Sequence, residues 1–285
     1  MRDWFKDPVS IRVSVNEICL GAREPMTTAI VRGIDNPVFK DAEPSSLWLK
    51  ALDQSIAGAL ASVRQPAVES EFPRIRELEV VFSDELCRLW LTAPPVNATE
   101  PGDCVAASVL RFESLFGLRA DRWRIVADLD ANRPFLSAAL PRALVDCVCA
   151  ALMSNGVRPA SIRPAFVGTW SRARREMSAG DWLAVVAPHS VTVARAGPRN
   201  WWSSGLSPDL VRILPRPEVS ALSAGVGGGS GWLAQAIRLE ALRQDLPVPQ
   251  RVLLCGEQLP GASKTGASKT GDDLLRFERF QKVEP

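Results

Sequence analysis

The predicted elements repeat in the same order along the chain, and this repetition restricts the possible folds more than any other feature. Residues 9–82 predict three strands, a helix and a strand, and residues 182–256 predict the same order. The last strand begins 66 residues after the first in one set and 68 residues after it in the other. This favours a duplicated α/β fold of two βββαβ lobes, although chance recurrence in an α/β protein is a competing interpretation.

Hydrophobic periodicity carries the individual predictions. Alternating apolar and polar residues favour half-buried strands, and apolar residues three or four apart favour amphipathic helices. In the first set we expect strands at 9–15, 17–23, 27–33 and 75–82 and a helix at 46–64. In the second set we expect strands at 182–187, 190–196, 199–206 and 250–256 and a helix at 231–244.

The segment between the two sets mixes helices and strands. We expect extended segments at 85–91, 122–129, 134–140 and 159–164 and helices at 103–117, 141–154 and 165–177. The chain then divides into three parts: 1–82 as part of the first lobe, 83–157 as an inserted α+β subdomain, and 158–285 as the second lobe.

The C-terminal region contains a tandem repeat, GASKT at 261–265 and again at 266–270. Its small and polar residues predict a flexible surface loop. It is not a phosphate-binding Walker A loop, because Ala267 stands where lysine is required. The apolar stretch at 274–283 is expected to close the second lobe as a strand or a helix.

Composition excludes several classes of protein. A net charge of +2 from 34 basic and 32 acidic residues gives no basic excess for nucleic acid. No apolar run reaches the roughly 18 residues that a membrane span needs, and the N-terminus lacks the apolar core of a secretory signal. The cysteines have no CxxC spacing, which favours buried, reduced thiols in the cytoplasm. They are Cys19, Cys87, Cys104, Cys147, Cys149 and Cys255.

Catalytic and metal sites find little support. The single histidine, His189, falls between two predicted strands, where a turn residue is the simpler interpretation. One histidine and scattered thiols give no pair at zinc spacing. We therefore expect no catalytic and no metal-binding residue. The acidic pairs, interpreted as solvated turns, are Asp128 with Asp130 and Asp272 with Asp273.

Two features are candidate binding sites. The glycines Gly227, Gly228 and Gly229 precede a predicted helix, whose N-terminal N–H groups attract anions, although a flexible linker explains them too. Trp201 and Trp202 are neighbours on a predicted strand, so they point to opposite faces and one of them is a candidate anchor for a partner. The arginines near 172–175 suit the C-terminal end of a helix, and an acidic partner or a membrane surface is the alternative.

The hairpin at 9–23, the strand at 75–82 leading into 80–94, the order of elements through 164 and RVLLCG at 251–256 together resemble a known family. The pattern is similar to the actin-like (ribonuclease H-like) cytoplasmic domain of the type II secretion L protein and to the related type IV pilus assembly M protein. The resemblance implies two lobes. In nucleotide-binding relatives each lobe holds phosphates and metal with an acidic-Gly-Ser/Thr turn.

This chain departs from that pattern in both lobes. Its first turn reads VSVNE at 13–17 and its second reads APHS at 187–190, where Pro188 also removes a backbone N–H. Of the nucleotide motifs, LCG at 254–256 alone resembles the glycine strand on the purine side, so Gly256 would join Gly227, Gly228 and Gly229 if nucleotide binds. We therefore expect no cofactor and no ATP hydrolysis.

The resemblance implies a non-catalytic scaffold on the cytoplasmic side of the inner membrane, held there through protein partners. The implied partners are cytoplasmic tails of inner-membrane assembly proteins, with an assembly ATPase as a further candidate. Two alternatives stay open. One is an actin-like protein that switches or polymerises with ATP, and the other is an unrelated α/β enzyme.

Overall fold

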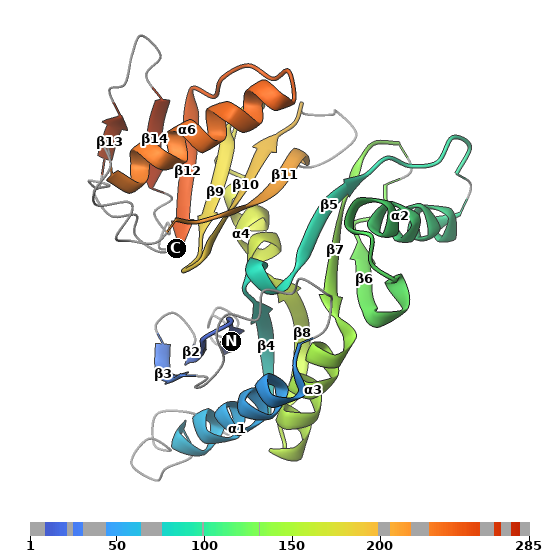
Figure 1. The fold of residues 1–285 in the computed structure, drawn as a ribbon, viewed down its shortest axis with the longest axis vertical. Coiled ribbons are helices and arrows are strands. Elements are labelled where there is room, and N and C mark those ends of the chain that lie inside the picture. Colours follow the sequence, from blue (N-terminus) through green and yellow to red (C-terminus); the bar gives the residue numbers. More distant parts are fainter. Residues whose placement is uncertain are drawn as a thin grey trace, which may run out of the picture. The chain divides into compact units, whose positions relative to one another are not determined.

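The computed structural model describes most of the chain, which forms two compact units (Figure 1). The described residues are 9–21, 25–30, 44–63, 76–98, 100–130, 132–198, 206–217, 228–256, 265–268 and 275–279. The first unit consists of Met1–Arg88, Val105–Val126 and Ala138–Ala165, and the second of Leu89–Cys104, Ala127–Ser137 and Phe166–Pro285.

The first unit is built on a five-stranded sheet with the order β3-β2-β1-β4-β8. β1, β2 and β3 form an antiparallel meander, whereas β4 and β8 continue the sheet in parallel with β1. Parallel neighbours need a long crossover connection, and α1 (Ser46–Val63) and α3 (Arg142–Ser154) lie in these connections. The strands are β1 (Ser10–Val13), β2 (Glu17–Gly21), β3 (Pro25–Ile30), β4 (Glu77–Phe82) and β8 (Arg158–Pro164).

Helix α1 buries one face against β2, β3 and α3. Trp48, Leu52 and Ile56 recur at helical spacing and are at most 1% exposed, as the periodicity predicts. They share an apolar core with Ile11 and Val80 of the central strands. Burial of this face stabilises the helix more than its intrinsic propensity does.

The second unit is built on a six-stranded sheet with the order β11-β10-β9-β12-β14-β13. Its central strand β9 is buried at every position. Helix α6 (Gly228–Arg243) adds Leu233 and Ile237 to the core of this unit, and α4 (Ala165–Ala173) precedes β9. The strands are β9 (Trp182–Val186), β10 (Ser190–Ala196), β11 (Pro208–Pro215), β12 (Arg251–Gly256), β13 (Thr265–Ser268) and β14 (Leu275–Arg279).

The two sheets follow one plan. In each, a meander of three antiparallel strands is followed by a helix and a fourth strand parallel to the first, and a fifth strand is parallel to the fourth. The order β3-β2-β1-β4-β8 thus matches β11-β10-β9-β12-β14. This confirms the predicted α/β fold of duplicated βββαβ lobes.

An ion pair crosses between the fourth and fifth strands of each sheet, with opposite polarity. In the first unit the carboxylate of Glu79 on β4 pairs with Arg163 on β8. In the second unit the guanidinium of Arg251 on β12 pairs with Glu278 on β14. In both cases the fifth-strand residue lies two positions beyond the register partner, Ser161 or Arg276. The geometry is therefore shared, and the signs of the charges are exchanged.

A third sheet has three strands, with β7 between β5 and β6. Trp123 of β6 packs against Phe112 of α2, with ring centroids 5.3 Å apart. Single helical turns at Asp84–Leu86 and Ala120–Arg122 precede β5 and β6. The predicted boundaries of the inserted subdomain, 83–157, stay a prediction. The elements are β5 (Arg88–Thr92), α2 (Pro101–Phe116), β6 (Trp123–Ala127) and β7 (Phe135–Pro141).

Most predicted elements occur within a few residues of their expected bounds, but the third strand of the second lobe was wrong. It was predicted at 199–206 and is β11 at Pro208–Pro215, while residues 199–205 lie outside the described part of the chain. Two helices also differ at their ends, because α6 begins at Gly228 and not at 231, and α4 ends at Ala173 and not at 177.

The loop prediction for the GASKT repeat was wrong for part of it. Thr265–Ser268 form β13, which pairs antiparallel with β14 through four residues. The remainder of the repeat, 261–264 and 269–270, lies outside the described residues. The stretch predicted as a strand or a helix at 274–283 contains the strand β14.

Candidate functional site

Ligands of parallel α/β sheets usually bind beyond the carboxyl ends of the strands. In the first unit β1 and β4 end side by side at Val13 and Phe82. In the second unit β9 and β12 end side by side at Val186 and Gly256. The turns that follow β1 and β9 are therefore one candidate site in each unit, and they are the turns in which the sequence lacks the phosphate-binding pattern.

The polar groups of the first turn are engaged within the protein. The backbone N–H of Ser14 donates to the carbonyl of Glu17 (2.9 Å), and the Ser14 hydroxyl accepts the N–H of Glu17 (3.1 Å). The N–H of Val15 donates to Oε1 of Glu85 (3.2 Å), and the Val15 carbonyl accepts the indole N–H of Trp48 (3.0 Å). A carboxylate of this chain thus takes a backbone donor in the first turn.

The sequence analysis missed the acidic residues Asp84 and Glu85. They follow β4 after one intervening residue, Ser83, and Asp84 is only 2% exposed. Burial, and then the nearby charge of Asp84, raises the pKa of the Cys87 thiol well above its usual range, so Cys87 stays protonated. The sequence did contain a signal for these two residues. They form an acidic pair shortly after an apolar strand, and the carboxyl end of that strand lies beside the first turn.

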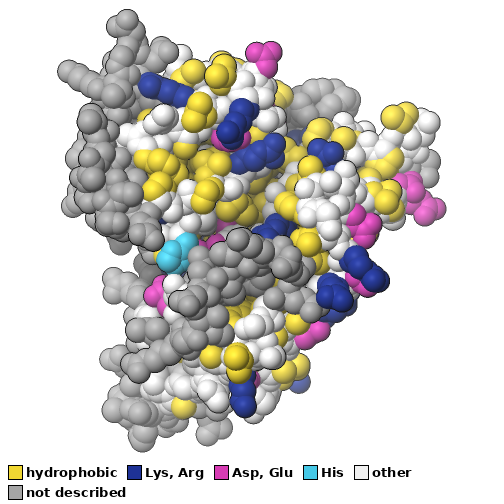
Figure 2. All heavy atoms as spheres, in the orientation of Figure 1, with side chains coloured by type: hydrophobic (Ala, Val, Ile, Leu, Met, Phe, Trp, Pro, Cys, Tyr) yellow, Lys and Arg dark blue, Asp and Glu magenta, His cyan; other side chains and the backbone are white. Residues whose placement is uncertain are grey.

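The second turn binds an arginine. The Ala187 N–H donates to the Ser190 carbonyl (2.9 Å). Arg216 donates its backbone N–H to the carbonyl of His189 (2.9 Å) and its Nη1 to the carbonyl of Ala187 (2.9 Å). Pro188 has no N–H to offer. His189 itself is an exposed residue of this turn, as predicted, and the face drawn in Figure 2 shows a histidine at the surface.

Packing explains Gly256 without a ligand. Its φ is +92°, and a Cβ atom at this position would lie 2.2 Å from the carbonyl oxygen of Val186. Any side chain would therefore strain the backbone and collide with β9. Burial raises the pKa of the neighbouring Cys255 thiol to about 12, so this end of β12 offers no thiolate nucleophile.

The predicted binding residues lie on different elements or outside the described residues, and Gly256 is the last residue of β12. Gly228 and Gly229 are the first residues of α6, so the linker interpretation was wrong for them. Gly227, Trp201 and Trp202 lie outside the described residues, and their roles stay predictions.

The paired acids do not form a metal site in the described part of the chain. Asp130 accepts the N–H of Asn132 and pairs with Arg133. Burial alone would raise the pKa of Asp130, but these two donors hold it below its usual value. No group of three His, Cys, Asp or Glu residues that could hold a metal occurs among the described residues. Asp272 and Asp273 lie outside them.

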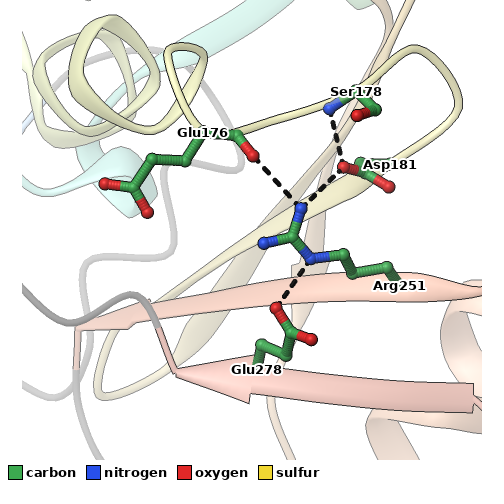
Figure 3. A network of polar contacts seen from close by, with 5 residues as sticks. All are labelled: Glu176, Ser178, Asp181, Arg251 and Glu278. Atoms are coloured by element: carbon green, nitrogen blue, oxygen red, sulfur yellow. Dashed lines mark hydrogen bonds and ion pairs between the residues drawn. The ribbon is translucent and has the colours of Figure 1, made fainter.

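Within the second unit, an ionic network links β14 to β12 and to the segment before β9 (Figure 3). Arg251 of β12 donates Nε to Glu278 of β14 (2.7 Å) and Nη1 to Asp181 (3.1 Å) and to the Glu176 carbonyl (3.1 Å). The Ser178 N–H also donates to Asp181 (2.7 Å). Burial alone would lower the pKa of Arg251, but the two carboxylates raise it, so the guanidinium stays charged. The network is structural.

Replacing Arg251 with methionine is expected to lower the free energy of unfolding by about 2 kcal/mol, because Asp181 would lose its cation in a site where its side chain is 13% exposed. Chemical denaturation measures the effect. Arg119→Met is the control, since Arg119 and Asp121 form an ion pair with side chains 79% and 56% exposed and should contribute less than about 0.5 kcal/mol. Equal losses for both variants would contradict a structural role of the network.

The duplicated sheets and the turns at their carboxyl ends define an actin-like fold. Two solved structures share it. The cytoplasmic domain of EpsL, an inner-membrane component of the type II secretion system of Vibrio cholerae, has a TM-score of 0.56 and 10% identity, over 95% of this chain and 88% of that chain. PilM in the PilM-PilN type IV pilus biogenesis complex has a TM-score of 0.55 and 14% identity, over 88% and 81%.

These likenesses confirm the predicted resemblance at the level of the fold. No protein-family model matches the chain, and no curated protein matches it in sequence. Among the described helices, none combines the length and the apolar character that crossing a membrane requires.

Proposed function

We propose that this chain is a non-catalytic assembly subunit of a type IV pilus or type II secretion-like apparatus. It would bind the cytoplasmic tails of inner-membrane partners, with an assembly ATPase as a further partner, on the cytoplasmic side of the inner membrane. The likeness in fold to the EpsL domain and to PilM, which is solved in a complex with PilN, supports this proposal.

The bond between the Val15 N–H and the Glu85 carboxylate carries the non-catalytic part of the proposal. A phosphate needs oriented donors and tolerates no uncompensated negative charge beside it. In the first turn a carboxylate already accepts a donor. In the second turn Pro188 lacks a donor, and Arg216 is bound to the turn carbonyls.

The main alternative is an actin-like protein that binds ATP. In the sequence its support was Gly256 together with the glycine-rich run at 225–231. The close approach of Gly256 to Val186 accounts for this glycine by packing alone, so it no longer argues for a nucleotide. The other alternative is an enzyme of unrelated α/β type, and it would have to use His189, which lies exposed on a turn.

Calorimetric titration with Mg-ATP is expected to give no binding up to about 1 mM, because the first turn holds a carboxylate where a phosphate would need donors. The variant Glu85→Gln tests whether the negative charge of this carboxylate is what opposes phosphate binding. This variant keeps a hydrogen-bond acceptor for Val15 and removes the charge, so it should remain folded and bind ATP no more weakly than the parent chain. Micromolar affinity of the unaltered chain for Mg-ATP would refute the non-catalytic assignment and favour the nucleotide switch.

The partner half of the proposal needs its own experiment. Synthetic peptides with the cytoplasmic tail sequences of pilus and secretion membrane subunits should bind the purified chain in a fluorescence anisotropy titration, and scrambled peptides of equal charge should not. Equal binding of native and scrambled peptides, or no binding by either, would contradict the assembly role and leave the result with Mg-ATP unaffected.

A further inference from the structure

Strand β6 is an exposed edge. In the described part of the chain it pairs with β7 alone, and it lies on the far side of β7 from β5 (Figure 1). Its sequence, WRIVA, has high β-propensity. One face is covered, because Trp123 is 2% exposed and packs on α2. On the other face Val126 is 70% exposed beside the exposed Arg124.

The outward hydrogen-bonding groups of β6 can be assigned. The N–H of Asp128, directly after β6, donates to the carbonyl of Leu136 on β7 (2.8 Å). In an antiparallel pair the backbone groups of successive residues point alternately toward and away from the neighbouring strand. Trp123, Ile125 and Ala127 therefore direct their backbone N–H and C=O groups away from β7. These groups could form hydrogen bonds with a further strand.

Three of the other edge strands carry proline, and β5, the opposite edge of the same sheet, has side chains that are buried or half-buried, whereas β6 has neither feature. Proline interrupts edge pairing because it has no N–H. β3 begins at Pro25, β8 contains Pro159 and Pro164, and β11 begins and ends at Pro208 and Pro215. The sequence of β6 contains no proline and no lysine. An unprotected strand of this composition requires a partner strand or favours aggregation.

We propose that the occupant is β6 of a second copy of the chain, paired antiparallel about a two-fold axis at Ile125. This arrangement joins the outward groups of Trp123 to those of Ala127 of the partner subunit. It also places Arg122 opposite Asp128 of the partner subunit, so that the two flanking charges are complementary. Charged side chains of both signs gather over this region on the face shown in Figure 2. The proposal is independent of the function proposed above.

The ladder is short, so the dimer is expected to be weak and to depend on concentration. In sedimentation equilibrium between about 1 and 200 µM, the average mass should rise from 31.0 kDa toward twice that value. The two-fold pairing consumes both edges, so no larger species should form. An average mass that stays at the monomer value, or that rises beyond the dimer value, would overturn the proposal. A mass that stays at the monomer value would indicate that a different protein pairs with the edge of β6.

Val126→Lys should weaken the dimer at least tenfold, because the new cation would face Arg124 of the partner subunit. Val96→Lys is the matched control, since Val96 is 91% exposed on a loop and should change nothing. Arg122→Asp should also weaken the dimer, and R122D/D128R should restore it by exchanging both charges. An unchanged dissociation constant in V126K, or no recovery in the double variant, would contradict pairing about Ile125. Circular dichroism confirms that each variant is folded.

Discussion

Replacing Gly256 with alanine is expected to lower the free energy of unfolding by roughly 3 kcal/mol. The φ of +92° disfavours any Cβ atom, and the added carbon would lie 2.2 Å from the carbonyl oxygen of Val186. The clash is with the backbone of β9, at the carboxyl ends of the parallel neighbours β9 and β12. The structure cannot relieve it by rotating a side chain. Denaturation with urea measures the loss.

Gly58→Ala is the matched control for this prediction. Gly58 lies within α1, and a Cβ atom there meets nothing within 4 Å. Because alanine is a better helix former than glycine, this variant should be more stable by about 0.5–1 kcal/mol. The same chemical change should thus act with opposite sign at the two positions. If G256A unfolded at the same urea concentration as the parent chain, packing against Val186 would not explain the glycine.

Replacing Trp48 with alanine should have an effect of similar or larger size, about 3–5 kcal/mol. Trp48 is 1% exposed, and its indole N–H donates to the carbonyl of Val15 (3.0 Å). The variant loses both the packing of α1 on the first sheet and the bond that holds the first turn. Trp48→Phe separates these contributions. It keeps most of the apolar contact but leaves the Val15 carbonyl without its donor, at a cost of about 1–3 kcal/mol.

Leu47→Ala provides the comparison for the tryptophan variants. Leu47 is the preceding residue of α1 and is 73% exposed, so its truncation should change the stability by less than about 0.5 kcal/mol. Denaturation curves for the four proteins, recorded by far-ultraviolet circular dichroism, give the order directly. Equal stability of W48F and the parent chain would show that the hydrogen bond to Val15 contributes nothing.

The regular elements of this fold were predictable because their patterns are local. The helix at 46–63 follows from the spacing of Trp48, Leu52 and Ile56, and the hairpin of β9 and β10 follows from two apolar runs separated by Ala187 to His189. The duplication was visible only as an order of elements. That order is sufficient to predict the duplicated fold, because a βββαβ unit has few arrangements that bury its apolar strands.

The errors occurred where long-range pairing decides the structure. The sequence analysis did not predict β11, which begins and ends with proline. Proline is tolerated there because β11 is an edge strand, where the missing N–H groups break no ladder. The repeat at 261–270 has the composition of a loop, but β14 supplies a pairing partner for Thr265–Ser268. No local pattern predicts either contact.

The chemistry of the candidate site was predictable only in part. Pro188 and the absence of an acidic-glycine turn were visible in the sequence and already argued against phosphate binding. The contact between Val15 and Glu85 joins residues 70 positions apart, and no local pattern connects them. Gly256 was selected as a residue that would contact a nucleotide, and that role stays a prediction. Its actual constraint, the carbonyl of Val186, becomes visible only once β12 and β9 are known to be neighbours.

The reversed ion pairs of the two sheets bear on how a duplicated chain keeps its halves distinct during folding. If β14 docked onto β4 in place of β8, the shared diagonal geometry would bring Glu278 against Glu79, carboxylate to carboxylate. The charge on Glu278 therefore favours pairing of β14 with β12 of its own half and disfavours pairing with β4 of the other half.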